Sequence, residues 1–405
     1  MKIVIAPDTY KGSLAAVDAA AAIAEGILSV CATVQVDVCP MADGGEGTVA
    51  AMVAATGGRM LRADVFGPLG APLRAHYALL GERREAALPG QLGLAAAEVS
   101  AEGEGTPATG ADGITAVVEM AAASGLGLVA QEHRDPRRTT TYGTGQLIMA
   151  ALDAGARRVI LGIGGSATLD GGAGALQAMG VRFYDRHGEP VVCGLAGGGL
   201  KDIARIDATG LDRHILPGTI RVAADVTNPL LGPNGAAAVY GPQKGATEEI
   251  VAELERALTH WARLLARETG IDVTGLCGGG AAGGLGAGLV ALAGASIDPG
   301  VEVVAAAVDL PRRLAGAALC ITGEGCLDAQ TLYGKTAAGV AKYAKAAGVP
   351  VVCLPGQIGE DAPLDLFDRV LPLAERPSEV NEARWNAAAM LKARAGKLIK
   401  EFLAS

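Results

Sequence analysis

Residues 1–38, MKIVIAPDTYKGSLAAVDAAAAIAEGILSVCATVQVDV, indicate the fold class. Residues 2–6 are a continuous apolar run that predicts a buried strand, and residues 34–38 have the same character. Residues 14–30 between them have the apolar spacing of a helix, with Ser13 as its predicted N-cap. A strand, a helix and a strand in this order predict a βαβ unit with parallel strands, and therefore an α/β fold.

The same alternation returns near the other end of the chain. Residues 318–322 predict a strand, 336–348 a helix closed by Gly348, and 349–354 another strand. Residues 369–373 resemble one more strand, and a closing helix is expected over 379–402. Both ends of the chain therefore predict parts of one parallel sheet.

The middle of the chain has a different pattern. It predicts, in order, short strands with turns over 59–100, a helix near 115–123, a Thr/Gly loop at 139–145, a helix over 146–154, and strands at 157–162 and 220–224. We expect two α/β domains: a discontinuous one from residues 1–58 and 295–405, and a mixed α/β insertion over 59–294. The active site is expected in the cleft between them.

Composition excludes several classes of protein. The chain has 405 residues, 59 of them Gly, a net charge of −9 and scattered Lys and Arg, which argues against a nucleic-acid partner. Its seven Cys lack metal-site spacing and predict reduced thiols in a cytoplasmic protein. We expect no secretion signal in MKIVIAP and no membrane span, since residues 275–297 read as a glycine loop before a buried helix. Residues 88–113 predict a surface loop.

Acids and lysines stand among glycines directly after the predicted strands. These segments are 7–13, 39–48, 164–172, 225–235 and 323–335. The carboxyl ends of parallel strands are where open α/β sheets bind ligands. Glycine loops let backbone amides approach phosphate oxygens, and acids in the same loops require a cation such as Mg²⁺ between them and the phosphate. The pattern therefore predicts metal-assisted phosphoryl transfer.

Two other functions stay open on these residues. Residues 162–167, GIGGSA, fit the dinucleotide pattern G-x-G-x-x-A, and Asp185 stands where a ribose-binding acid would, as in an NAD-dependent oxidoreductase. A non-catalytic protein that binds sugar acids is the other alternative. Gly334, Lys335 and Thr336 resemble the end of a P-loop, but Ala329 stands where that motif needs glycine, so we reject it.

Longer blocks carry a resemblance to a known family. They are, in order, IAPDTYKGSL, MADGGEGT, TTTYGTGQLI, GIGGSATLDGGAG, DVTNPLLGPNGAA, YGPQKGAT, GGGAAGGLGAGL and TGEGCLDAQTLYGKT. Together they resemble the bacterial glycerate kinase family, of the glycerate 2-kinase type. The resemblance implies a Rossmann- or flavodoxin-like domain from both chain ends. It also implies transfer of the γ-phosphoryl group of ATP to D-glycerate with Mg²⁺, and it leaves a homo-oligomer open.

The resemblance also implies roles for single residues. The catalytic residues would be Lys11, Asp43 and Asp170, with Asp170 and Asp225 at the metal. Substrate contacts would come from Asp8, Ser13, Glu46, Asp225, Asn228, Glu324 and Asp328. The nucleotide and its phosphates would lie on Gly164, Gly165, Ser166, Thr168, Lys244 and Lys335. The division of labour among the acids, and the choice between the 2- and the 3-hydroxyl of glycerate, stay open.

Overall fold

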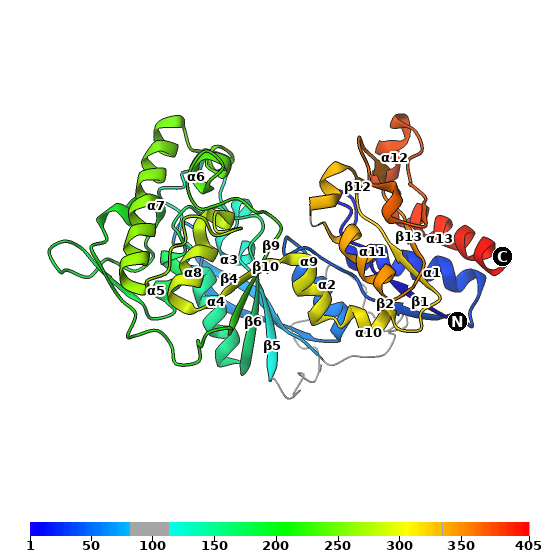
Figure 1. Ribbon diagram of the computed structural model, residues 1–405, viewed down its shortest axis with the longest axis horizontal. Helices are drawn as coiled ribbons and strands as arrows, with labels where there is room; N and C mark the ends of the chain where they lie inside the picture. The colour runs from blue at the N-terminus through cyan, green and yellow to red at the C-terminus, as the bar shows by residue number, and fades with distance from the viewer. Residues whose placement is uncertain (82–112, 334, 405) are drawn as a thin grey trace.

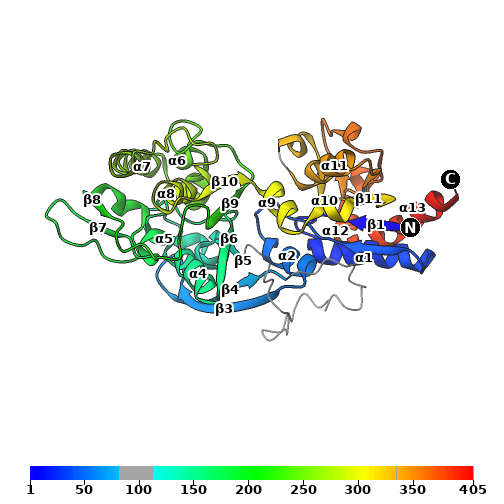
Figure 2. The same ribbon diagram turned by 60° about the horizontal axis from the view of Figure 1, so that its bottom comes forward.

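The protein forms two lobes, each with a large sheet at its centre (Figures 1 and 2). The structure is a computed structural model and describes residues 1–81, 113–333 and 335–404. The surface loop predicted for 88–113 therefore lies outside the described residues, except for its last residue. Among the described helices none is long and apolar enough to cross a membrane.

The terminal sheet contains strands from both ends of the chain, as expected. Its order is β15 (Arg369–Val370), β13 (Val351–Cys353), β11 (Leu319–Thr322), β1 (Lys2–Ile5) and β2 (Gln35–Val38), and every neighbouring pair is parallel. Counted along the chain this order is 2-1-3-4-5, as in flavodoxin-like sheets. The strand order reverses between β1 and β11, and ligands bind at such switch points.

Helices cover both faces of the terminal sheet. Ile3 and Ile5 pack against α1 (Ala16–Val30) and α13 (Ala387–Ala404), whereas Val4 faces α9 (Gly300–Ala307), α10 (Leu310–Leu314) and α11 (Thr336–Ala346). Successive residues of a strand point to opposite faces, so a continuous apolar strand is buried on both. The terminal sheet is thus the middle layer of a three-layer lobe.

The central sheet is mixed. Its order is β10 (Ser296–Pro299), β9 (Ile220–Ala224), β6 (Ala156–Gly162), β5 (Ile114–Glu119), β4 (Pro72–Leu79) and β3 (Arg59–Phe66). The four strands from β10 to β5 are parallel, and β4 and β3 form an antiparallel hairpin at one edge. The carboxyl ends of the parallel strands again form one edge at which loops can gather.

The outer face of the central sheet packs against helices of the middle of the chain. These are α4 (Tyr142–Asp153), α5 (Ala173–Ala178), α6 (Ala236–Tyr240), α7 (Glu248–Thr269) and α8 (Leu285–Ala293). The remaining helices are α3 (Ala121–Ser124) and α12 (Val380–Trp385). Two small strand pairs are β7 (Arg182–Tyr184) with β8 (Arg205–Asp207) and β12 (Cys326–Leu327) with β14 (Gln357–Ile358). Short 3₁₀ helices occur at Leu126–Leu128, Gln131–His133, Gly197–Asp202, Pro242–Lys244, Ala281–Gly284, Ala329–Tyr333, Leu364–Leu366 and Pro377–Glu379.

The inner faces of the two sheets share one apolar core. Helices α2 (Thr48–Thr56) and α9 lie between the lobes in both views (Figures 1 and 2). Val49 and Met52 of α2 and Val304 of α9 belong to one cluster that also holds Val4 of the terminal sheet and Val117 of the central sheet. The two sheets are therefore held together by buried apolar contact rather than by a linker alone.

Several local predictions were wrong. Residues 114–119 form strand β5, and only Ala121–Ser124 are helical, where a helix near 115–123 was expected. Ser13 does not cap α1, which begins at Ala16; its hydroxyl donates to the carbonyl oxygen of Arg384. The predicted closing helix is two helices, α12 and α13, separated at Asn386.

One predicted domain boundary, at residue 295, assigns a strand to a different sheet from the one in which the strand is observed. Strand β10 was placed with the terminal segment that begins at residue 295, but it pairs with β9 in the central sheet. The central sheet therefore takes its strands from residues 59–299. That each sheet is the centre of a separate domain stays a prediction.

Candidate active site

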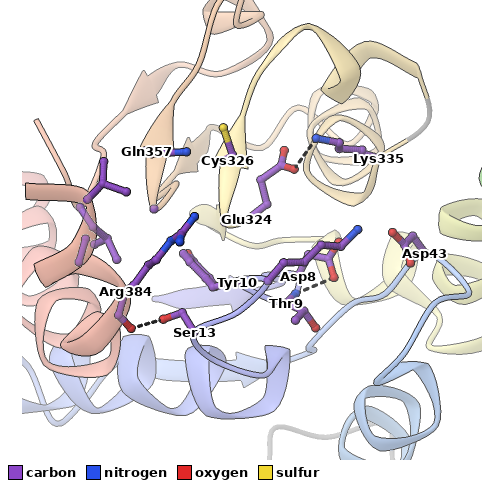
Figure 3. A pocket seen from close by; sticks show the side chains of 16 residues that line it. Asp8, Thr9, Tyr10, Ser13, Asp43, Glu324, Cys326, Lys335, Gln357 and Arg384 are labelled. Atoms are coloured by element: carbon purple, nitrogen blue, oxygen red, sulfur yellow. Dashed lines mark hydrogen bonds and ion pairs between the residues drawn. The ribbon is translucent and has the colours of Figure 1, made fainter. Parts of the chain in front are cut away.

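Two adjoining cavities open at the carboxyl edges of the sheets. The switch-point cavity, of about 210 Å³, lies beyond β1 and β11 and is drawn in Figure 3. The glycine-loop cavity, of about 890 Å³, reaches from the same loops to those after β6 and β9. Residues that line both cavities are Asp8, Thr9, Tyr10, Lys11, Ser13 and Asp43. A group bound in one cavity can therefore meet a group bound in the other at this shared wall.

The loop after β1 is fixed at two points. The Tyr10 hydroxyl is buried and donates to the carbonyl oxygen of Leu354, at the end of β13. Ser13 is tied to Arg384 of α12, as Figure 3 shows. Between these anchors, Lys11 is exposed and lines both cavities. The sequence-predicted Asp8, Lys11 and Ser13 are therefore brought together at one wall.

Three carboxyl groups face one another at the junction of the lobes. Burial and then the carboxylates of Asp43 and Asp8 raise the pKa of Asp225 to about 9. Burial and the same Asp43 raise the pKa of Asp8 to about 6. A Cβ on Gly300, at the start of α9, would lie 1.7 Å from the Asp43 carbonyl oxygen and 2.8 Å from Asp225 Oδ1, so only glycine permits this approach.

This carboxylate group fits a divalent cation that also binds phosphate. Asp225 Oδ1 is buried and has no hydrogen-bond partner in the described part of the chain. Among those residues no cluster of three His, Cys, Asp or Glu forms a metal site by itself. Mg²⁺ does not need one, because it is bound through one or two carboxylates and completes its shell with water and substrate phosphates. Asp43 and Asp225 are the carboxylates here that would form such a pair.

The switch-point cavity also carries cations. Lys335 donates to Asp328 Oδ1 at 3.0 Å and lies 3.6 Å from Glu324 Oε2. Burial raises the pKa of Glu324 to about 7 despite this lysine. Arg384 lines the same cavity from α12 and points into it (Figure 3). Sequence reasoning missed Arg384, because it stands in a helix with no motif around it.

The glycines after β6 permit close contact with the loop after β2. A Cβ on Gly162 would lie 2.6 Å from Gly44 O, and one on Gly164 would lie 2.8 Å from Gly45 Cα. Gly164, Gly165 and Ser166 then line the glycine-loop cavity, as predicted for a phosphate site. Glu46 also lines this cavity.

Other predicted residues lie behind this wall rather than on it. Lys244 is buried, and its Nζ donates to Ser166 Oγ at 2.8 Å and to Thr168 O at 2.7 Å. Burial lowers the pKa of Lys244 to about 7. Thr168 is fully buried too, so it supports the loop through its carbonyl oxygen. Lys244 contacts the cavity wall through the Ser166 hydroxyl and lies 5.9 Å from the ring centre of Tyr240, which also lines the cavity.

Asp170 lies behind the loop rather than on a cavity wall, and its predicted place at a metal or a reacting group stays a prediction. Its carboxylate is fully buried and accepts hydrogen bonds from Thr141 N at 2.7 Å, Thr141 Oγ1 at 2.8 Å and Gly172 N at 3.1 Å. These donors already occupy its oxygens, so Asp170 holds the loop to the start of α4. Asn228 also lies off the cavity walls; it donates to Asn234 O and accepts from the Tyr240 hydroxyl.

The dinucleotide alternative does not fit the observed fold. Its motif requires a helix directly after the glycines, but α5 begins only at Ala173. Asp185 lies in an exposed turn after β7, outside both large sheets, where it accepts from His187 N and Glu189 N. We therefore discard the NAD-dependent reading of residues 162–167.

The site combines a sheet of flavodoxin order, a glycine loop, and carboxylates beside lysines at one junction. These features are typical of an α/β enzyme that transfers phosphoryl groups without a P-loop. Comparison with known proteins identifies which one. The model of the glycerate kinase family matches residues 3–403, and the chain belongs to this family. The resemblance seen in the sequence is thereby confirmed, and the chain is an enzyme that phosphorylates an alcohol group.

Individual relatives and a solved structure agree with this family assignment. The chain is 46% identical over 383 residues to a glycerate kinase of Halalkalibacterium halodurans, covering 92% of each chain. It is 45% identical over 361 residues to the glycerate 2-kinase of Escherichia coli K12, covering 89% of this chain and 86% of that one. The crystal structure of a putative glycerate kinase 2 from Salmonella typhimurium LT2 superposes with a TM-score of 0.84 at 43% identity, covering 100% and 98%. These relatives give no support to a non-catalytic binding protein.

Proposed function

We propose that the protein transfers the γ-phosphoryl group of ATP to the 2-hydroxyl of D-glycerate, giving 2-phosphoglycerate, with Mg²⁺. The observation that carries this proposal is the wall shared by the two cavities, where Asp8, Lys11 and Asp43 face both. In-line transfer needs the acceptor hydroxyl and the γ-phosphoryl group side by side, with cations and a proton acceptor at that point. The Escherichia coli relative is a glycerate 2-kinase, which supports the choice of the 2-hydroxyl.

The acceptor belongs in the switch-point cavity. It is the smaller of the two, at about 210 Å³, and it carries Lys11, Lys335 and Arg384. Within the described residues the side chains of Lys11 and Arg384 make no hydrogen bond or ion pair, whereas Lys335 is held by Asp328, and of the two free cations Arg384 is the guanidinium. A guanidinium binds a carboxylate through two parallel hydrogen bonds. We therefore assign the glycerate carboxylate to Arg384.

The donor belongs in the glycine-loop cavity. Gly164, Gly165 and Ser166 present backbone and a hydroxyl there, and Lys244 supports Ser166 from behind. Asp43 and Asp225 would hold Mg²⁺, which when bound neutralises charge on the transferring phosphoryl group. Asp225 lines this cavity and not the switch-point cavity, which supports a metal position on the donor side of the wall.

The proton of the acceptor hydroxyl requires a base on the shared wall. Asp8 lines both cavities, and its Oδ1 is held by the backbone N–H of Thr9 at 2.6 Å. A positioned carboxylate at this point can accept the proton as the new P–O bond forms. Lys11 beside it stabilises the negative charge that develops. Glu324, buried next to Lys335, orients that lysine instead.

The test is ADP release with ATP, Mg²⁺ and D-glycerate, followed by ³¹P NMR of the product. We expect turnover that requires all three and a phosphate at carbon 2. The variant Asp43→Asn should lower turnover roughly 100-fold or more, while Asp153→Asn, at an exposed helix end, should leave it unchanged. Wild-type turnover in Asp43→Asn would place the reaction elsewhere.

We also place this reaction in the cytoplasm, because all seven cysteines are free thiols, as in proteins of reducing compartments.

A further inference from the structure

A third cavity, of about 410 Å³, lies beside the glycine loop; we name it the side cavity. It shares the lining residues Glu46, Gly47, Leu126 and Gly165 with the glycine-loop cavity, so the two adjoin. Its other walls come from α2, from β3 and β4, and from the segment after β5. Parts of one ligand could therefore occupy both cavities only by passing these shared residues.

The lining of the side cavity is mostly apolar. Its apolar side chains are Ala50, Met60, Ala121, Ala122, Leu126 and Leu128, and glycines 47, 125, 127 and 165 add bare backbone. Leu128 is 43% exposed although it is a large apolar residue. Walls of small aliphatic side chains and backbone suit a planar ring, which they can contact on both faces.

The side cavity and the switch-point cavity differ in the charged residues that line them. Lys11, Lys335 and Arg384 line the switch-point cavity, but no Lys or Arg among the described residues lines the side cavity. Its buried acid, Glu119, is already engaged, since Oε1 accepts the backbone N–H of Val49 at 2.7 Å. An organic acid or a phosphate has no cation to pair with here, whereas an uncharged heterocycle needs none.

The wall between the side cavity and the phosphate loop is built from two paired segments. Leu126 N donates to Gly165 O at 2.8 Å, and Ala167 N donates to Ser124 O at 2.9 Å. The segment after β5 is therefore fixed to the glycine loop after β6. Any ring bound against Leu126 is held at a set position relative to phosphates on Gly164 and Ser166.

We propose that the side cavity binds the purine base of the ATP donor, with the triphosphate running over the glycine loop toward the shared wall. The proposal rests on the proposed kinase function and adds the place of the base. His76 and Glu46, both on the wall of the cavity, are side chains that can hydrogen-bond the edge of the ring. Selectivity for the base would then come from this wall and not from the switch-point cavity.

The test compares ATP with inorganic tripolyphosphate, which has the phosphates but no base. In the wild type we expect ATP to bind roughly 10- to 100-fold more tightly than tripolyphosphate, because the base buries apolar surface. Ala50→Leu narrows the side cavity and should remove most of that difference by weakening ATP alone. Ala393→Leu, an exposed helical alanine on α13, is the matched control and should change neither affinity.

A second variant keeps the test decisive if Ala50→Leu fails to fold. Leu128→Ala removes an exposed rim side chain, and we expect it to raise the KM for ATP several-fold with an unchanged KM for glycerate. The inference is overturned if both variants bind ATP as the wild type does, or if they lose ATP and tripolyphosphate equally. If the wild type binds ATP but transfers nothing to glycerate, the proposed function fails and the base site stands.

Discussion

Glu119→Gln should make the protein more stable above neutral pH. Glu119 is 7% exposed, and its Oε1 accepts the N–H of Val49 in the first turn of α2. Burial, and then Glu46, outweigh the helix amides and raise the pKa of Glu119 from 4.5 to about 7. Ionising this carboxyl group in the folded state therefore costs roughly 3 kcal/mol. A neutral glutamine keeps the acceptor for Val49 without that cost.

The sign of the effect follows from proton binding. Between pH 4.5 and about 7 the folded state holds a proton that the unfolded chain has released, so the free energy of unfolding of the wild type falls with rising pH. Glu119→Gln should match the wild type below pH 4.5 and exceed it by up to about 3 kcal/mol above pH 7.

Urea unfolding of both proteins at several pH values between 4 and 8 measures this difference. Glu46→Gln is the control, because removing that neighbouring charge should lower the pKa of Glu119 and shrink the effect. Parallel stability curves for wild type and Glu119→Gln would refute the reasoning.

Three further predictions concern the reaction centre. At pH 7 in metal-free buffer, Asp225→Asn should raise the free energy of unfolding by roughly 4 kcal/mol, because the folded carboxyl group, with a pKa of about 9, keeps a proton that the unfolded chain releases, whereas an amide does not titrate. The same variant should abolish Mg²⁺-dependent turnover; unfolding curves and ADP release measure both effects. Arg384→Gln should raise the KM for glycerate roughly 10- to 100-fold with an unchanged KM for ATP, in steady-state kinetics. Gly300→Ala should lower kcat sharply because its Cβ would meet Asp43 O, whereas Gly275→Ala, with no atom within 4 Å, should not.

The position of three acids of the candidate site could be predicted because the order of strands and helices could be predicted. Asp8, Asp43 and Asp225 each follow a predicted parallel strand, and the observed sheets bring those carboxyl ends together. The alternation of strands and helices near both chain ends was enough to predict that edge. No side-chain geometry was needed for this step.

Arg384 and Asp170 show where that reasoning stops. Arg384 reaches the site because its backbone carbonyl binds Ser13, 371 residues earlier in the chain, and no local pattern reports such a contact. Asp170 stands in a glycine loop like the true cavity acids, but Thr141 donates to it from behind the loop. Whether an acid in a loop faces the cavity or the core depends on a distant partner, which spacing cannot reveal.

Strand β5 was misread for a related reason. Residues 114–119, ITAVVE, lie in a parallel region buried on both faces, so they lack the alternation that marks a half-exposed strand. The alanines that follow at 121–123 then extend the apolar run and suggest a helix. Because of this error, sequence reasoning missed Glu119, at the carboxyl end of this strand, and the wall of the side cavity that follows it.

The packing between the sheets explains how acids from both lobes hold one position. Asp43 precedes α2, and Gly300 begins α9 beside Asp225. Both helices are buried in the core that the two sheets share. Since apolar interiors are close-packed and resist deformation, the carboxylates are fixed by the same contacts that join the lobes. Any closure of the site around its substrates would have to keep these buried contacts or rebuild them.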